Sequence, residues 1–418
     1  MASTTSSSIK NYALVTLAYW GFTITDGALR MLVLLYFYKI GYSPLEIAFL
    51  FLFYEVFGIF TNFFGGWIGS QFGLRVTLYS GLALQVFALI MLSWVNPNWA
   101  QWLAVSYVMV AQAFSGIAKD LTKMSSKSAI KLVVPEDAES SLFKWVAVLT
   151  GSKNALKGVG FFVGSALLTL FGFVNALWIM AGGLFLILFT SIMLPEDMGK
   201  IKQKVNFKEL FSKSEEINIL SAARFFLFGS RDVWFVVGLP VFLEGTLGWS
   251  FYQVGGFMAC WVIGYGIIQS LAPTLIQKFG SGEPPQSKTI QFWTFTLTGI
   301  PGAIALALQL GLPANLVIVS GLMLFGIVFA FNSAVHSYLV LAFTDDEKVA
   351  LNVGFYYMAN SGGRLAGTVL SGLVYQIFGL VGCLWVSMSF VLAAGLISLK
   401  LPDPQPSQAI AWKAGGGD

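Results

Sequence analysis

The sequence predicts an all-α integral membrane protein with twelve transmembrane helices in two six-helix halves. Charged residues make up 11% of the chain and hydrophobic residues 56%, whereas an ordinary soluble domain has about 25% charged residues. The mean hydropathy is +0.76. The apolar residues lie in separated blocks of membrane-spanning length, which favours a helical bundle over the alternating pattern of an outer-membrane barrel.

Each of the twelve spans is expected from one apolar block. The first block is too long for the apolar region of a secretory signal and no cleavage-site pattern follows it, so we expect it to remain as the first span. Cys260 and Cys383 fall within blocks, where we expect inert small hydrophobic residues rather than a disulfide. The blocks lie near residues 12–38, 44–69, 74–95, 99–122, 140–170, 173–194, 217–243, 250–278, 288–310, 314–342, 347–377 and 380–400.

The distribution of positive charge predicts the orientation of the chain. With the N-terminus in the cytoplasm, most of the 24 lysines and arginines fall in cytoplasmic loops and tails, and Lys39 is the one that lies outside. Lysine and arginine concentrate in cytoplasmic loops. We therefore expect both termini in the cytoplasm.

An internal duplication organises the chain. The hydrophilic segment 195–216 is expected to be a cytoplasmic linker between halves at 1–194 and 217–402, followed by a cytoplasmic tail at 403–418. Landmarks recur after 207 residues: GYS at 41–43 with GWS at 248–250, FG at 171–172 with FG at 378–379, and Lys157 with Arg364; Asp26 recurs as Asp232 after 206. Duplicated six-helix halves with a site between them resemble the major facilitator superfamily.

The loop after the second span strengthens that resemblance. GGWIGSQFGLR at 65–75 has the position and much of the pattern of the signature loop of the superfamily. Ser70 stands where the superfamily usually has an aspartate that latches onto the opposite half. The resemblance therefore does not imply that latch here.

Charged residues inside the spans predict an anionic substrate. A charge at the centre of a bilayer costs about 3 kcal/mol or more, so such residues are expected to face a cavity or one another. Lys144 is close enough to the inner end to reach the interface. The remaining embedded bases outnumber the embedded acids. The bases are Arg30, Lys119, Lys153, Lys157, Arg224, Arg231 and Arg364, and the acids are Asp26, Glu55, Asp120 and Asp232.

The embedded arginines suggest how an oxyanion is held. Arg30 and Arg231 lie near the middle of the first helix of their half. This placement resembles the organophosphate/phosphate antiporters, which use an arginine on helix one and another on helix seven to bind phosphate. The planar guanidinium group suits this task because it offers two parallel donors. Arg231 and Asp232 are adjacent and point about 100° apart, so we do not expect them to serve one contact.

The lysines form two further candidate groups. Lys153 and Lys157 share a helix face and would repel each other unless an anion, or acids from other helices, lay between them. Lys119, Lys123 and Lys127 continue with similar spacing towards the cytoplasmic end of span four. This stripe either guides anions to the site or is a solvated helix end. We include Lys119, Lys123, Lys153, Lys157, Arg224 and Arg364 with the two mid-helix arginines as candidate substrate-binding residues.

The acids and the single histidine are candidates for coupling or gating. Asp26 and Arg30, four residues apart, form a structural pair or take part in binding and coupling. Glu55 is a proton-coupling or gating residue, or else the buried partner of Arg30. Asp120 and Asp232 are included as candidates because they too are acids inside predicted spans. His336 either titrates near neutral pH or is a core histidine satisfied by a neighbour.

Four stretches carry a specific resemblance to a known family: YWGFTITDGALRMLV, FLFYEVFGIFTNFFGGWIG, SGIAKDLTKMSSKSAIKLVVP and LTGSKNALKGVGFFVG. They resemble the ArsJ family, organoarsenical efflux permeases of the major facilitator superfamily. The resemblance is dense over residues 11–172 and looser to about residue 400. It implies a monomeric secondary transporter of the bacterial inner membrane that exports 1-arseno-3-phosphoglycerate. A companion glyceraldehyde-3-phosphate dehydrogenase makes that compound from arsenate, so its export confers arsenate resistance.

The implied substrate agrees with the charges. It carries two oxyanions, for which Arg30 with Arg231 and Lys153 with Lys157 are the candidate binding groups. We expect Arg30 to bind one oxyanion, and Asp26 to hold Arg30 in place in the empty protein and to accept a proton during the return step. The expected partners are the anionic substrate and the lipid bilayer, with a functional link to the dehydrogenase and no role for nucleic acid.

Other function classes fit the sequence less well. An enzyme needs a nucleophile, a metal cluster or a catalytic base, and one histidine with two scattered cysteines supplies none of these. We therefore expect no catalytic residue, metal or cofactor. The alternative function is an organophosphate/phosphate antiporter, which exchange with phosphate on the opposite side would reveal. A proton-coupled exporter of lipophilic cations conflicts with the excess of embedded bases.

Overall fold

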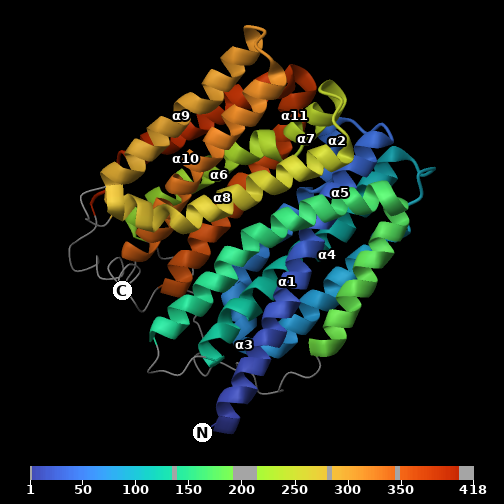
Figure 1. Cartoon of the computed structure of the whole chain (residues 1–418), viewed down its shortest axis with the longest axis vertical. Helices are drawn as coiled ribbons and strands as arrows, with labels where there is room; N and C mark the ends of the chain where they lie inside the picture. The colour runs from blue at the N-terminus through green and yellow to red at the C-terminus, as the bar shows by residue number, and fades with distance from the viewer. Residues whose placement is uncertain (1, 134–138, 192–213, 280–284, 344–348, 404–418) are drawn as a thin grey trace. The chain divides into compact units, whose positions relative to one another are not determined.

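The computed structural model describes residues 2–133, 139–191, 214–279, 285–343 and 349–403, and within these ranges every regular element is a helix (Figure 1). Most of the predicted linker at 195–216, and the tail from residue 404, lie outside the described residues. The elements are α1 (Ala2–Lys39), α2 (Pro44–Leu50), α3 (Leu52–Ser93), α4 (Gln101–Val133), α5 (Glu139–Ser191), α6 (Glu215–Phe235), α7 (Gly238–Val241), the π-helix η2 (Phe242–Thr246), α8 (Phe251–Phe279), α9 (Ser287–Gln309), α10 (Ala314–Ala342) and α11 (Val349–Ser398).

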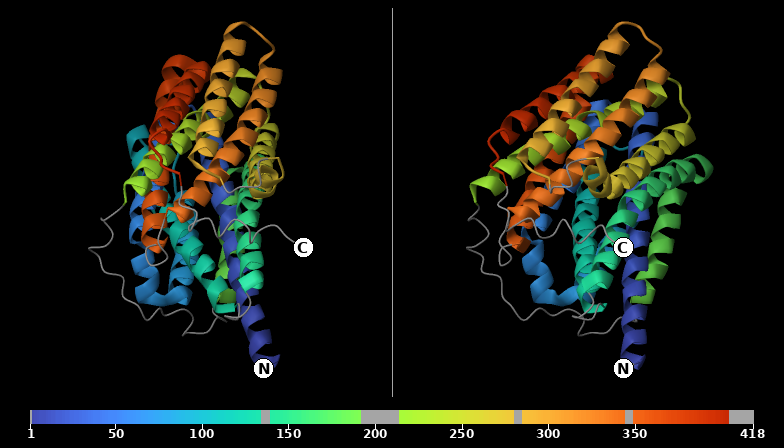
Figure 2. Two further views of the ribbon diagram at one scale, coloured as in Figure 1. Left: turned by 90° about the vertical axis from the view of Figure 1, so that its left-hand side faces the viewer. Right: turned by 60° about the vertical axis from the view of Figure 1, so that its left-hand side comes forward.

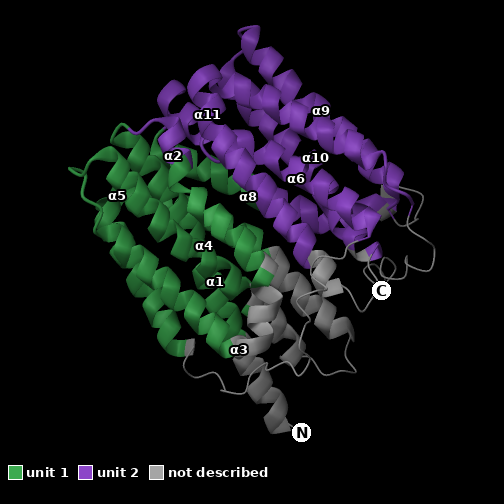
Figure 3. Ribbon diagram, turned by 180° about the vertical axis from the view of Figure 1, so that it is seen from behind, with its two compact units in different colours: residues 1–41, 49–207, 250–263 green, residues 42–48, 208–249, 264–418 purple. Residues whose placement is uncertain are grey.

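The chain forms two compact units (Figure 3). Unit 1 consists of residues 1–41, 49–207 and 250–263, and unit 2 of residues 42–48, 208–249 and 264–418. In unit 1, α1 packs against α5 and α3 against α4. In unit 2, α6 packs against α11, and α9 lies beside α10 (Figure 2). The predicted domain boundaries stay a prediction.

The predicted spans are present as long apolar helical segments. Nine stretches of the described residues are long and apolar enough to cross a membrane. Two of them, Ser152–Thr190 and Gly354–Ser398, are each broken by a glycine with a left-handed backbone, Gly172 and Gly379. Counting these as two segments each, and adding α1, the described residues provide the twelve expected segments.

Two pairs of positive-φ glycines show the duplication in the backbone. Gly41 and Gly248 have φ of 94° and 69°, and Gly172 and Gly379 have φ of 74° and 64°. Residues with a side chain rarely adopt this conformation, so glycine is required where the chain turns between helices. Each pair is separated by the 207 residues of the predicted repeat. The repeat in the sequence therefore corresponds to a repeat of local structure.

Matching helix starts follow the first of these glycine pairs. The Ser43 amide donates to Glu46 Oε2 at 2.8 Å, and the Ser250 amide donates to Gln253 Oε1 at 2.8 Å. In return, the Glu46 and Gln253 amides donate to the Ser43 and Ser250 hydroxyl oxygens, at 3.4 Å in each case. This reciprocal arrangement is the capping box, which satisfies backbone donors that the first helical turn leaves open.

Glycines also bring the first and fifth spans of each half close together. A methyl group on Gly160 of α5 would collide with the Ile24 carbonyl of α1, and one on Gly367 of α11 would lie 2.7 Å from the Gly229 carbonyl of α6. Gly160 and Gly367 are again 207 residues apart. Small residues allow such close backbone approach between membrane helices. This contact sets the positions of the charged residues on the same four helices.

The surface is apolar, as the composition predicts. Leu186, Phe189 and Leu316 are about two-thirds exposed, and Leu310 is 71% exposed. Apolar surface of this extent suits lipid rather than water.

Candidate functional site

Arg30 on α1 is paired with Glu55 on α3 in unit 1. Arg30 Nη2 lies 2.7 Å from Glu55 Oε1, and both residues are buried. The guanidinium carbon is 5.2 Å from the centroids of the Phe51 and Tyr54 rings, which adds cation–π attraction. Of the two alternatives for Glu55, the structure therefore shows the second: Glu55 is the buried partner of Arg30.

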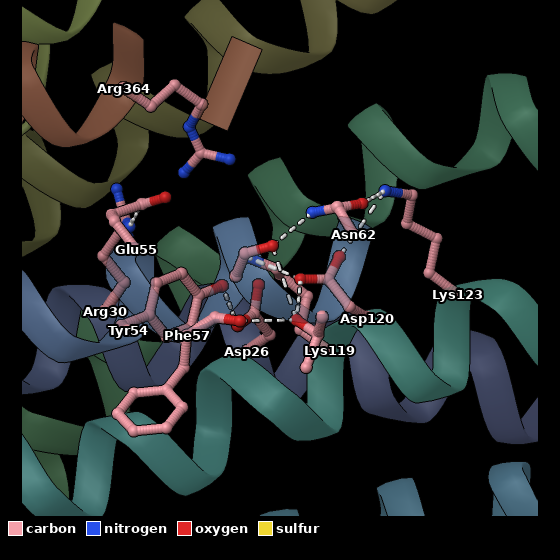
Figure 4. Close-up of polar contacts among 12 residues, drawn as sticks. Asp26, Arg30, Tyr54, Glu55, Phe57, Asn62, Lys119, Asp120, Lys123 and Arg364 are labelled. Carbon is pink, nitrogen blue, oxygen red and sulfur yellow. Dashed lines mark hydrogen bonds and ion pairs between the residues drawn. The ribbon is translucent and has the colours of Figure 1, made fainter. Parts of the chain in front are cut away.

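Asp26 does not hold Arg30, so that expectation was wrong. Asp26 Oδ1 instead accepts a hydrogen bond from the Tyr54 hydroxyl at 2.6 Å, and Asp26 Oδ2 lies 4.0 Å from Lys157 Nζ on α5. Figure 4 shows Tyr54 pointing towards Asp26. The four-residue spacing put both charges on one helix face, but neighbouring helices supply each with a nearer partner. Lys153, one turn before Lys157, is partly buried.

Asp120 on α4 holds the two lysines of the predicted stripe (Figure 4). Its carboxylate accepts a hydrogen bond from the Thr61 hydroxyl at 3.0 Å and lies 3.9 Å from Lys119 Nζ and 3.5 Å from Lys123 Nζ. Lys123 also donates to Asn62 Oδ1 at 2.9 Å. Lys119 and Lys123 are thus organised around a buried acid, which a simple solvated helix end would not require. The side chain of Lys127 lies outside the described residues, as does that of Ser70.

Asp232 on α6 is the corresponding acid of unit 2. Its Oδ2 lies 3.2 Å from Arg364 Nε on α11, and its Oδ1 accepts from Arg231 Nε at 2.6 Å. Arg231 and Asp232 bond each other, which the sequence analysis did not anticipate; that the two do not serve one common contact stays a prediction. The backbone directs them about 100° apart, but the long arginine side chain folds back to reach the adjacent carboxylate.

One ion pair recurs in both units. Asp26 with Lys157 joins α1 to α5, and Asp232 with Arg364 joins α6 to α11. The side chains of the two acids are 8% and 1% exposed, and those of the two bases 21% and 15%. In each pair the acid is buried and the base retains an accessible portion. Such a base can meet an anion while the acid keeps it in position.

Arg224 on α6 has a different environment. Its Nε donates to Asn360 Oδ1 at 3.0 Å and its Nη1 to Ser333 Oγ at 3.3 Å. The guanidinium carbon lies 3.8 Å from the centroid of the Phe228 ring. Arg224 is 4% exposed, and in the part of the chain that the structure describes no carboxylate pairs with it.

His336 is fully buried on α10 in the same unit. Neither ring nitrogen has a hydrogen-bond partner among the described residues, and His336 lies about one helical turn after Ser333, which accepts a hydrogen bond from Arg224. The alternative of a core histidine satisfied by a neighbour therefore does not fit. The described residues contain no group of three or more His, Cys, Asp or Glu side chains that could hold a metal ion.

The neutral partners of these charges were missed by the sequence reasoning. Tyr54, Asn62, Ser333 and Asn360 carry no charge and sit in apolar or small-residue contexts. Asn360 precedes Arg364 by one helical turn, and Ser333 precedes His336 by three residues, so both share a face with a candidate. That spacing was the available signal.

Comparison with known families assigns the fold. The family model described as Major Facilitator Superfamily matches residues 13–334 and 220–416. The chain belongs to the major facilitator superfamily. Membership confirms the predicted fold class and supports secondary transport, because proteins of this superfamily are transporters and in general not enzymes.

Solved structures of other transporters share the major facilitator fold. A D-xylose–proton symporter is 15% identical in sequence, and the match covers 96% of this chain and 98% of the symporter with a TM-score of 0.67. A bacterial homologue of the iron transporter ferroportin, in an inward-facing state, is 15% identical with 94% and 98% covered and a TM-score of 0.68. A nucleoside transporter is 14% identical in sequence, and the match covers 94% of this chain and 98% of that transporter with a TM-score of 0.68.

The cargo of this major facilitator has to be argued from its own residues. The three solved structures differ in what they are named for, a sugar, iron and nucleosides, although their folds are alike. Fold does not determine function in such a case. A comparison with curated protein sequences finds no match.

Proposed function

We propose that this transporter exports 1-arseno-3-phosphoglycerate from the cytoplasm by alternating access and so confers arsenate resistance. The observation that carries the proposal is the grouping of bases around single buried acids. Asp120 lies within 4 Å of two lysines, and Asp232 of two arginines. Two bases on one carboxylate leave a positive charge that an anion can neutralise.

The grouped bases match the chemistry of this substrate. A phosphate ester and an arsenate ester carry several negative charges at two separate ends, which calls for more than one basic group. These bases keep 15–21% of their side chains exposed, so an oxyanion can reach them and compete with the carboxylate. The resemblance of the four quoted stretches to organoarsenical permeases selects this substrate from among multiply charged anions.

The buried acids suggest how the bases are held before the substrate binds and after it is released. In the empty protein Glu55 holds Arg30, Asp26 holds Lys157 and Asp232 holds Arg364, so each of these bases keeps a carboxylate partner inside the membrane. The oxyanions then compete with these carboxylates for the same bases. Release of the substrate lets each carboxylate recapture its base. Asp26, Glu55, Asp120, Asp232 and His336 are thus proposed to act in coupling or gating, with the protein monomeric in the bacterial inner membrane and both termini cytoplasmic.

Everted membrane vesicles provide the test. Arsenate, glyceraldehyde 3-phosphate, NAD and glyceraldehyde-3-phosphate dehydrogenase are supplied outside, and arsenic is measured inside, with one component omitted at a time. Accumulation that requires every component, and that fails in vesicles carrying Asp232→Ala, supports the proposal. Vesicles carrying Lys39→Gln, which removes an exposed charge, serve as the control.

The same vesicles distinguish the proposed exporter from a second candidate function, that of an organophosphate/phosphate antiporter. The basis for this candidate is the presence of one arginine on α1 and another on α6, Arg30 and Arg231. Arsenic would then fail to accumulate, while phosphate esters would exchange against phosphate loaded inside. That outcome would reject the organoarsenical as cargo.

A further inference from the structure

We propose that Arg224, Ser333, Asn360 and His336 of unit 2 form a buried subsite for one tetrahedral oxyanion. This subsite deepens the proposed function, on which its assignment to the exported compound rests. The residues come from three helices, since Arg224 lies on α6, Ser333 and His336 on α10, and Asn360 on α11. The ligand class is an inorganic phosphate or arsenate group, or the same group at one end of a larger anion.

The charge of Arg224 requires a partner that the described chain does not supply. Arg30 is compensated by Glu55, and Arg231 and Arg364 share Asp232. Arg224 is 4% exposed and contacts the neutral oxygens of Ser333 and Asn360 together with the Phe228 ring. A buried charge without a counter-ion is unfavourable. A bound anion removes that cost.

The guanidinium of Arg224 keeps a donor that the described residues do not use. Nε and Nη1 are used by Asn360 and Ser333, whereas Nη2 donates to no acceptor in the described ranges. The Ser333 hydroxyl already accepts from Tyr265 and Gln269 of α8, each at 3.2 Å. These bonds fix Ser333 and thereby the plane of the guanidinium. A fixed arginine fork favours a tetrahedral oxyanion over a cation.

His336 is a second, independent sign of a missing ligand. Both ring nitrogens are buried and without a partner in the described part of the chain. Burying a polar group without a hydrogen bond is costly, and buried polar groups are nearly always paired. An oxyanion beside Arg224 would accept a hydrogen bond from the imidazole and satisfy it.

The subsite belongs to one half of the duplication. Shifting Arg224 back by 207 or 206 residues gives Leu17 or Ala18, neither of which can bind an anion. In contrast, the acid–base pair of Asp232 and Arg364 recurs as Asp26 and Lys157. A substrate whose two ends differ, such as a phosphate ester with an arsenate ester, needs an asymmetric site of this kind.

Anion binding to the purified protein tests the subsite directly. The full-length protein in lipid nanodiscs is titrated with inorganic phosphate and with arsenate, and the apparent Kd is taken from the shift of Tm. We expect Arg224→Gln to weaken binding by about 100-fold and Arg224→Lys by about tenfold, because a lysine is a point charge without the fork. Lys39→Gln, the control for loss of one positive charge, should bind as the native protein does. Native affinity in Arg224→Gln would overturn the proposal.

A second variant covers the case in which Arg224→Gln does not fold. Asn360→Asp places a carboxylate at the Nε of Arg224 and should supply the missing counter-ion. We expect it to raise the Tm of the unliganded protein and to abolish the response to phosphate. A raised Tm with native phosphate affinity would show that Arg224 is structural, and would overturn the proposal.

The vesicle assay distinguishes failure of the subsite from failure of the proposed cargo. Native phosphate affinity together with unchanged arsenic accumulation in Arg224→Gln would reject the subsite and leave the exported compound in place. Phosphate binding that depends on Arg224, without any arsenic accumulation by the native protein, would support the subsite and reject the organoarsenical.

Discussion

At the scale of single residues, the charges were predictable from the sequence but their partners were not. Hydropathy located Arg30, Glu55 and Asp120 within spans because a charge stands out in an apolar block. Pairing depends on which helix faces meet, and Arg30 finds Glu55 across 25 positions in the sequence. Tyr54, which separates Asp26 from Arg30, carries no charge and gave no signal.

Replacing Glu55 leaves Arg30 buried without its acid. We expect Glu55→Gln to destabilise the protein by about 3 kcal/mol, since breaking one partner of a buried pair leaves an uncompensated charge. The Tm of the detergent-purified protein measures this loss. Adding Arg30→Met should restore much of the stability, because the double variant contains no unpaired charge. An unchanged Tm in the single variant would contradict the pairing.

Replacing Asp232 removes the acid that competes with the substrate. Asp232→Asn leaves Arg231 and Arg364 available to an anion, so we expect phosphate affinity to rise about fivefold and the transport rate to fall because release slows. Binding to nanodiscs and efflux from vesicles measure the two effects. Asp26→Asn, with one base at 4.0 Å, is the matched variant and should show a smaller change. Weaker phosphate binding in Asp232→Asn would contradict competition.

At the scale of helices, the duplication was predictable because it leaves landmarks at a constant spacing. The FG pairs coincide with the helix breaks at Gly172 and Gly379, and GYS and GWS with the capping boxes that follow Gly41 and Gly248. The close contact at Gly160 was not predicted, since the many glycines of the chain look alike in the sequence. Only the structure shows that the backbone of α1 lies directly against Gly160.

Substituting Gly160 tests the contact between α1 and α5. Gly160→Ala places a methyl group against the Ile24 carbonyl, so we expect destabilisation of about 2 kcal/mol and loss of transport as Asp26 moves away from Lys157. Thermal unfolding and the vesicle assay measure both. Gly182→Ala in the segment of α5 that follows the break at Gly172, where nothing lies within 4 Å of an added methyl group, is the control. Equal Tm values for the two variants would contradict the role of Gly160.

At the scale of the whole molecule, the superfamily could be predicted and the cargo could not. The bilayer imposes a length on every span, so the hydropathy of the sequence alone locates the twelve segments. Cargo depends on a few polar side chains whose relative positions come from packing. Ser333 and Asn360 illustrate this, since they meet at Arg224 from separate helices.

The orientation of the chain is testable by labelling. In a variant lacking Cys260 and Cys383, a cysteine at Asn98 should react with a membrane-impermeant maleimide in spheroplasts, and one at Lys288 should react after lysis. Both positions are exposed in the structure, so access depends on the side of the membrane. Labelling of Lys288→Cys in intact spheroplasts would reverse the predicted topology.

The recurrence of the acid–base pair bears on the history of the protein. Because Asp26–Lys157 and Asp232–Arg364 join equivalent helices in the two halves, the pair belonged to the six-helix ancestor before its gene was doubled. Arg224 has no such twin, so the two copies have diverged at this position since the doubling. The ancestor therefore already kept a basic side chain within the membrane, and both descendants of that gene segment have retained one.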